Sequence, residues 1–232
     1  MNHSKRLRFV VAVLLGITGV TWAQMGHPGM MRQSPPMVGA FNPTVGAGSE
    51  FQMTTKEGTM NFTLVVVGKE TVNGADGYWM EQRFEGGRMP GEMVQKQLLV
   101  MQNGKPDIKR MIMQPPGQQP MEMPVGMMHR GPQQAPPGED TDPGKKIGTE
   151  SVTVPAGTFD CDHYRKQTER GTYDYWISME VSPYPIVKMK GPDSTMVLAK
   201  VLSGETSHIH GQPRQMPGFP PGAPGMPGMP PH

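Results

Sequence analysis

Methionine and histidine carry the most distinctive chemistry in this sequence, because 23 of its 232 residues are methionine. The densest group lies in a central segment rich in proline and glycine and consists of Met121, Met123, Met127, Met128 and His129. Thioether and imidazole groups are soft ligands that suit Cu(I), above all in an oxidising exported compartment where thiolates do not compete. The group is therefore a candidate copper site. The alternative is that methionine accompanies proline and glycine in low-complexity sequence.

A second set of apolar side chains falls at alternating positions of strand-like segments and could line a surface for a ligand. Methionine is flexible, fits irregular space in protein cores and recurs on promiscuous apolar binding surfaces. A curved sheet with such walls would suit an acyl chain, a lipid or a similar apolar small molecule. Core packing is the competing interpretation, and one face can serve both purposes. The candidate ligand-lining residues are Met60, Phe62, Leu64, Met80, Phe84, Phe159 and Tyr175.

Cys161 is the only cysteine, so the chain cannot form an internal disulfide. Period-two alternation places Phe159, Cys161 and His163 on one face of a strand. A small buried thiol is favoured over a reactive one, since a catalytic pair of Cys161 and His163 would also need a group that orients the imidazole. The sequence has no G-x-S-x-G, H-E-x-x-H or P-loop motif. We therefore expect no enzyme and no cofactor, and assign no catalytic residue.

Residues 1–23 have the three parts of an export signal. A basic region with Lys5 and Arg6 precedes an apolar run over residues 9–20, and small residues end the segment at the positions that a signal peptidase reads. The apolar run is shorter than the ~20 residues of a stable bilayer span, which favours cleavage before Gln24 over an uncleaved anchor. We expect a periplasmic or secreted protein in which no other segment spans a membrane as a helix.

The charge of the chain depends on this leader. It holds three of the 22 basic residues and none of the 20 acidic ones, so its removal changes the net charge from +2 to −1. Nucleic-acid binding needs lysine and arginine clustered on one face, and the sequence shows no such cluster. Nucleic acid is therefore excluded as a partner, whereas any protein partner is left open.

Glycine and proline number 30 and 26, and 34 of them fall in residues 24–46, 114–144 and 211–232. These segments have too few apolar positions to offset the entropy of ordering the chain. We predict a flexible N-terminal segment at 24–46, a disordered insertion at 114–144 and a disordered tail at 204–232. The tail is either a plain tether or a polyproline-like segment that docks into an aromatic groove of a partner, which makes a structural or interaction module a third hypothesis.

Apolar and polar residues alternate with period two in the remaining sequence, which predicts antiparallel strands. Asn73-Gly74 and Asp76-Gly77 together mark one reversal between them, and Asn103-Gly104 marks another. A helix over residues 92–100 is possible, but the same residues suit a strand at least as well. The expected strands span residues 49–55, 60–67, 78–84, 94–101, 108–113, 150–154, 158–167, 172–178, 186–190 and 195–202.

About nine or ten strands without a definite helix predict a mainly β protein. We expect a single antiparallel meander curled into a half-barrel, with a sandwich as the alternative. The domain would span residues 47–203 with the insertion inside it, which leaves enough residues for one core of its own.

Three stretches of the second half, Glu150 to Cys161, Tyr173 to Ser178 and Pro185 to Lys188, resemble a pattern found in uncharacterised families of exported bacterial proteins. Those families are related in fold to the periplasmic lipoprotein-localisation carriers. The resemblance covers mainly residues 147–203. It implies an incomplete barrel of antiparallel strands around an apolar cavity that holds acyl chains, and it transfers no functional residue to this sequence.

Overall fold

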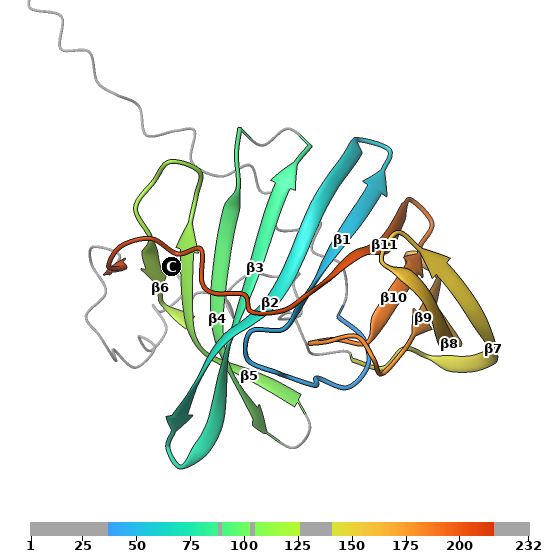
Figure 1. The fold of residues 1–232 in the computed structure, drawn as a ribbon, viewed down its shortest axis with the longest axis horizontal. Helices are drawn as coiled ribbons and strands as arrows, with labels where there is room; N and C mark the ends of the chain where they lie inside the picture. The colour runs from blue at the N-terminus through green and yellow to red at the C-terminus, as the bar shows by residue number, and fades with distance from the viewer. Residues whose placement is uncertain (1–36, 88–89, 103–104, 126–140, 216–232) are drawn as a thin grey trace, which may run out of the picture. The chain divides into compact units, whose positions relative to one another are not determined.

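The computed structural model describes residues 37–87, 90–102, 105–125 and 141–215, which all belong to one compact unit. Twelve strands in these residues form a single sheet, with the order β12-β6-β5-β4-β3-β2-β1-β11-β10-β9-β8-β7 (Figure 1). The strands are β1 (Gly48–Thr55), β2 (Gly58–Val72), β3 (Ala75–Gly86), β4 (Met93–Gln102), β5 (Lys105–Gln114), β6 (Met121–Met123), β7 (Lys145–Val154), β8 (Gly157–Thr168), β9 (Gly171–Ile177), β10 (Ile186–Lys190), β11 (Ser194–Leu202) and β12 (Arg214–Gln215). The described residues contain no helix among their elements, and the prediction of a mainly β protein is confirmed.

Two antiparallel meanders, β1 to β6 and β7 to β11, join where β1 pairs with β11, so that Met53 lies opposite Met196. The sheet is open and does not close into a barrel. Its second half curls strongly, because β7 at the edge contacts β10 and β11 although three strands separate it from β11. The amide of Ala156, in the turn after β7, donates a hydrogen bond to the carbonyl of Leu198 on β11 at 3.3 Å.

The turn between β2 and β3 is the hairpin that Asn73-Gly74 predicts. Asn73 and Gly74 have φ angles of 50° and 82°, and a two-residue hairpin of this kind needs positive φ at both positions. Asp76-Gly77, which the sequence assigns to the same reversal, lies inside β3 instead, where Gly77 pairs with Val100. The alternative of a helix over residues 92–100 is wrong, because residues 93–100 belong to the strand β4. Asn103-Gly104 lies outside the described residues, but β4 and β5 pair as expected.

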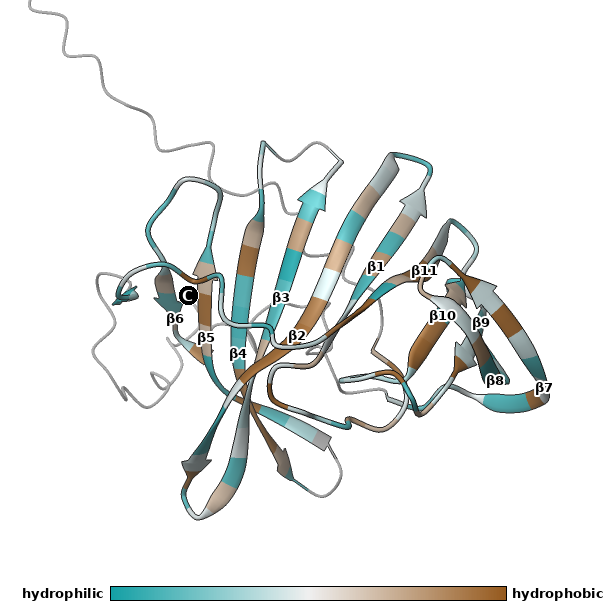
Figure 2. Ribbon diagram, in the orientation of Figure 1, coloured by the Kyte–Doolittle hydropathy of each residue, from teal (hydrophilic) through white to brown (hydrophobic). Residues whose placement is uncertain are grey.

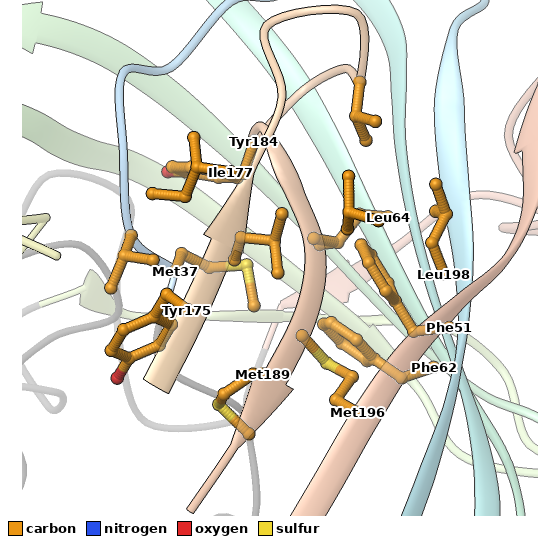
Figure 3. Close-up of a cluster of buried hydrophobic side chains, with 14 of the residues drawn as sticks. Met37, Phe51, Phe62, Leu64, Tyr175, Ile177, Tyr184, Met189, Met196 and Leu198 are labelled. Atoms are coloured by element: carbon orange, nitrogen blue, oxygen red, sulfur yellow. The ribbon is translucent and has the colours of Figure 1, made fainter. Parts of the chain in front are cut away.

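The main hydrophobic core packs β1 and β2 against β9, β10 and β11, as Figure 3 shows for Phe51, Phe62, Tyr175 and Met196 among others. Apolar and polar side chains alternate along the first strands, which Figure 2 shows as bands of opposite colour. The buried members of this core are Met37, Val38, Phe51, Met53, Phe62, Leu64, Met80, Phe84, Leu99, Ile108, Val152, Val154, Phe159, Cys161, Tyr175, Trp176, Ile177, Val181, Tyr184, Ile186, Val187, Met189, Met196 and Leu198.

Parts of the segments for which the sequence predicts flexibility pack on the sheet instead. Met37 and Val38 are buried in the core, and the Gly39 amide donates to the Thr141 carbonyl at 2.8 Å. The central insertion contributes β6, and residues 203–215 cross the sheet from β11 to reach it (Figure 1). These segments are held by contacts with distant strands, which local composition does not reveal. The remainder of the three segments, together with the export signal predicted at 1–23, lies outside the described residues.

Candidate functional site

One side of the strands β3 to β6 carries an unusual combination of methionine and glutamine. The register places Met80, Gln97, Met111 and Met123 in one row across these four strands. The neighbouring row consists of Gln82, Gln95, Met113 and Met121. We call this side the methionine face and define it by Met80, Gln82, Met93, Gln95, Gln97, Met111, Met113, Met121 and Met123.

Gln97 is the exceptional residue of the methionine face. Its side chain is fully buried, and neither Nε2 nor Oε1 has a hydrogen-bond partner among the residues that the structure describes. Buried amides nearly always have partners, because leaving the group desolvated and unpaired costs about 1–3 kcal/mol. Its cross-strand neighbours, Met80 and Met111, offer no strong hydrogen-bonding group.

The methionines at the β5 and β6 end of this face form two cross-strand pairs. Met111 lies opposite Met123, and Met113 lies opposite Met121. Met111 is buried, whereas the other three side chains are half-buried. Among the described residues, the main hydrophobic core includes none of these four methionines. The four residues therefore occupy neighbouring positions of the β5–β6 ladder, outside the main hydrophobic core.

The seven residues that the sequence suggests as ligand-lining come together in the structure. Met60, Phe62 and Leu64 lie on the same side of the sheet as Met80 and Phe84, because Phe62 pairs with Phe84 and Val66 with Met80. Phe159 and Tyr175 reach the same core from β8 and β9. Six of the seven are buried, and Met60 is partly buried and packs against them. They form a packed core, and their contact with a ligand stays a prediction.

The sequence-based copper set is only partly described. Met121 and Met123 lie on β6, whereas Met127, Met128 and His129 lie outside the described residues. Sequence reasoning missed Gln97 and did not connect Met111 and Met113 with Met121 and Met123. The period-two pattern of Gln95 and Gln97 is visible in the sequence, but the pairing of β5 with β6 is not. Within the described part of the chain, no three or more histidine, cysteine or acidic side chains form a group that could hold a metal ion.

On the opposite side of β3, the buried ion pair of Glu81 and Arg83 binds residues 205–207, which follow β11. The guanidinium of Arg83 donates to Oε1 of Glu81 at 2.9 Å, and both side chains are almost fully buried. Arg83 also donates to Oε2 of Glu205 and to the carbonyl of Thr206, each at 2.9 Å. The hydroxyl of Ser207 donates to Oε2 of Glu81 at 2.6 Å.

A second anchoring contact lies beside this pair. The amide of His208 donates to Oε1 of Glu81 at 2.9 Å, and the His208 ring lies 3.1 Å from a Glu92 carboxylate oxygen. Lys96 lies beneath the same segment, over the ring of Trp79, and burial lowers the pKa of its ammonium group. The polar groups of this side are thus paired, in contrast to Gln97 on the methionine face.

Cys161 and His163 both lie on β8, where Cys161 belongs to the main hydrophobic core and His163 to a separate polar cluster. The ring of His163 stacks on Trp176 with a centroid distance of 4.3 Å and lies 3.0 Å from a carboxylate oxygen of both Glu150 and Asp174. Cys161 is fully buried, and its thiol donates to the Phe159 carbonyl. Burial, with smaller contributions from nearby carboxylates, raises the thiol pKa from 9.0 to about 11. The prediction of a buried, unreactive thiol is therefore favoured over a nucleophile.

No helix in the described residues is both long and apolar enough to cross a membrane. Neither a protein-family model nor a curated protein matches the chain. Two solved structures are similar to it. One, provisionally described as a lipoprotein from Parabacteroides distasonis, is 16% identical with a TM-score of 0.38, and the match covers 69% of this chain and 97% of that one.

The other, provisionally described as an exported protein with a YmcC-like fold from Bacteroides fragilis, is 15% identical with a TM-score of 0.33. The match covers 70% of this chain and 98% of that one. At these scores neither likeness supports a conclusion about this chain. Kinship with the lipoprotein-localisation carriers therefore stays a prediction.

Proposed function

We propose that this chain is an exported, non-enzymatic β domain that binds an amphiphilic molecule, with the apolar part of the ligand against the methionine face. The observation that carries the proposal is the buried amide of Gln97, which has no partner among the described residues. Export itself rests on the sequence of residues 1–23, and places the protein in the periplasm or outside the cell.

The chemistry of Gln97 indicates what the ligand must offer. A primary amide presents both a donor and an acceptor. A ligand that carries a carboxyl, amide or hydroxyl group would satisfy at least one of them and recover the free energy lost by leaving the amide unpaired. Since every neighbour of Gln97 in its row is apolar, this single polar contact would fix the orientation of the ligand.

The surroundings of Gln97 can adapt to a guest. Met80 and Met111 flank it, and the half-buried Met93 and Met113 lie on the same face. Methionine has three rotatable side-chain bonds, so the surface can rearrange around a chain of variable shape at low cost. The apolar residues Leu64 and Phe84 continue the face toward the core, which is how the sequence-based lining set would take part.

Fatty-acid titration tests this proposal. The mature chain should take up a fluorescent long-chain fatty acid, and native mass spectrometry of protein isolated from its own compartment should show an extractable lipid or fatty acid. Replacing Gln97 with leucine should weaken uptake by about tenfold, the value of one lost hydrogen bond of ~1.4 kcal/mol.

The matched control is Gln95→Leu, which removes the half-buried amide two positions earlier on the same face. This variant should bind the probe like the unmodified protein. The proposal fails if the mature chain takes up no fatty acid and carries no lipid, or if the Gln97 and Gln95 variants weaken binding equally.

A further inference from the structure

We infer that the four methionines at the β5 and β6 end of the methionine face form a binding site for a soft monovalent metal ion, Cu(I). The set consists of Met111, Met113, Met121 and Met123, which we call the thioether quartet. The quartet is part of the methionine face, but Cu(I) binding depends on sulfur lone pairs, whereas amphiphile binding depends on apolar surface and on Gln97.

The register carries the geometry of the quartet. Met111 pairs with Met123 and Met113 pairs with Met121, so the four Cα atoms mark the corners of one cell of the antiparallel ladder. Directly opposite residues have Cβ atoms about 4.5–5.5 Å apart, and alternate residues on one strand point to the same side. Long, flexible methionine side chains on such a cell can bring their sulfur atoms to a common point.

The chemistry of the quartet selects the metal. Thioether sulfur is a soft, uncharged ligand that favours Cu(I), whereas Ca²⁺ and Mg²⁺ require oxygen ligands. Ile112 and Glu122, the residues between the methionines, lie on the other side of the ladder, where the Glu122 carboxylate accepts hydrogen bonds from Arg110. No carboxylate therefore competes for the ion from within the quartet.

A second row of four methionines shows why the first is different. Met60, Met53, Met196 and Met189 also follow each other across adjacent strands. Three of them are fully or nearly fully buried, and all four pack in or against the main hydrophobic core. Their side chains therefore contribute to core packing. In the quartet Met113, Met121 and Met123 are half-buried and lie outside that core, which leaves an approach for an ion.

The test is a Cu(I) competition titration of the mature chain against a chromophoric chelator, without oxygen. The double variant Met113→Leu and Met121→Leu should lose one equivalent of bound Cu(I), since leucine keeps the volume and apolarity but has no sulfur. The matched control is Met53→Leu and Met60→Leu, a cross-strand pair from the core row, and it should lose none. Circular dichroism and thermal unfolding establish that both variants are folded.

The pH dependence distinguishes this site from one built on histidine. Thioethers do not titrate, so binding to the quartet should be unchanged between about pH 5.5 and 7.5, whereas imidazole, with a pKa of about 6.5, would lose the ion at the acid end. The inference is overturned if the Met113 and Met121 variant keeps every bound equivalent, or if the lost equivalent is also lost on acidification. Cu(I) binding should survive in Gln97→Leu, because this change leaves all four thioethers in place.

Discussion

Gln97 on β4 lies directly opposite Met111 on β5, so the unpaired buried amide is adjacent to the thioether quartet. This part of the sheet therefore carries an unpaired buried amide, which costs stability, beside four methionines that lie outside the main hydrophobic core. Elsewhere in the sheet, buried polar groups such as Glu81 and Arg83 are paired with one another and with the segment after β11. This contrast makes the methionine face the strongest candidate for function in the described residues.

Replacing Gln97 with leucine should stabilise the ligand-free protein. The change removes a buried amide without partners, so we expect the free energy of unfolding to rise by about 1 kcal/mol. Urea denaturation measures the difference, and Gln95→Leu, at a half-buried position, should change stability by less than about 0.5 kcal/mol. A loss of stability in Gln97→Leu would mean that the amide has a partner that the contacts described above do not include.

Replacing Glu81 with alanine should destabilise the protein by about 3–5 kcal/mol, because Arg83 would remain buried with only one carboxylate partner, Glu205. The midpoint of urea denaturation measures this loss. The control is Glu50→Ala, which breaks the more exposed pair of Glu50 and Lys200 and should cost at most about 1 kcal/mol.

A shortened chain that ends at residue 203 refines this prediction. Without the segment that covers β3, Arg83 would be open to water, and the cost of Glu81→Ala should shrink toward that of the surface control. Equal costs in the full and shortened chains would show that residues 204–215 do not bury this ion pair.

The folded protein should lose stability at alkaline pH. Burial, aided by nearby carboxylates, raises the pKa of Cys161 from 9.0 to about 11, and burial raises the pKa of Tyr184 from 10.0 to about 12. A raised pKa contributes stability below the unfolded value, and this contribution disappears as the pH rises through the folded value. The free energy of unfolding should therefore fall between pH 9.0 and 12. In the Cys161→Ala variant this free energy should fall less steeply than in the unmodified protein. Rapid labelling of the folded thiol at about pH 8 would contradict the assignment of a buried thiol.

Asp174 should make the protein sensitive to acid. Burial by itself would raise the pKa of this carboxyl, but hydrogen bonds from Arg165 at 2.8 Å and His163 at 3.0 Å outweigh it and hold the pKa below 3.8. The resulting stability is present above pH 3.8 and is lost as the pH falls through the folded value. Asp174→Asn should therefore be less stable than the unmodified protein at neutral pH, and the difference should narrow below pH 3.8, as measured by urea denaturation at each pH. A constant difference would rule out this explanation.

Period-two alternation located nearly all of the strands, because alternation is a local property of a half-buried strand. It also placed Phe62, Leu64 and Met80 in the interior, where the structure finds them buried. Asn73-Gly74 marked its hairpin because both residues tolerate positive φ. Asp76-Gly77 did not form a turn, because this dipeptide permits a reversal but does not require one. Pairing with β4 keeps Gly77 in the strand β3.

The sequence by itself thus determined which residues form strands and which side of each strand is apolar, because both depend on neighbours along the chain. Only the tertiary structure decided that β1 pairs with β11, that residues 203–215 cross the sheet to bury Glu81 and Arg83, and that Met113 meets Met121. The contacts of β1 with β11 and of residues 203–215 with Glu81 and Arg83 join residues that are far apart in sequence, and their free energy arises when two distant segments lose water together. Alternation alone would assign Glu81 to the solvent side of β3. The segment that covers Glu81 lies more than a hundred residues later in the chain, and the residues near Glu81 in the sequence give no sign of it.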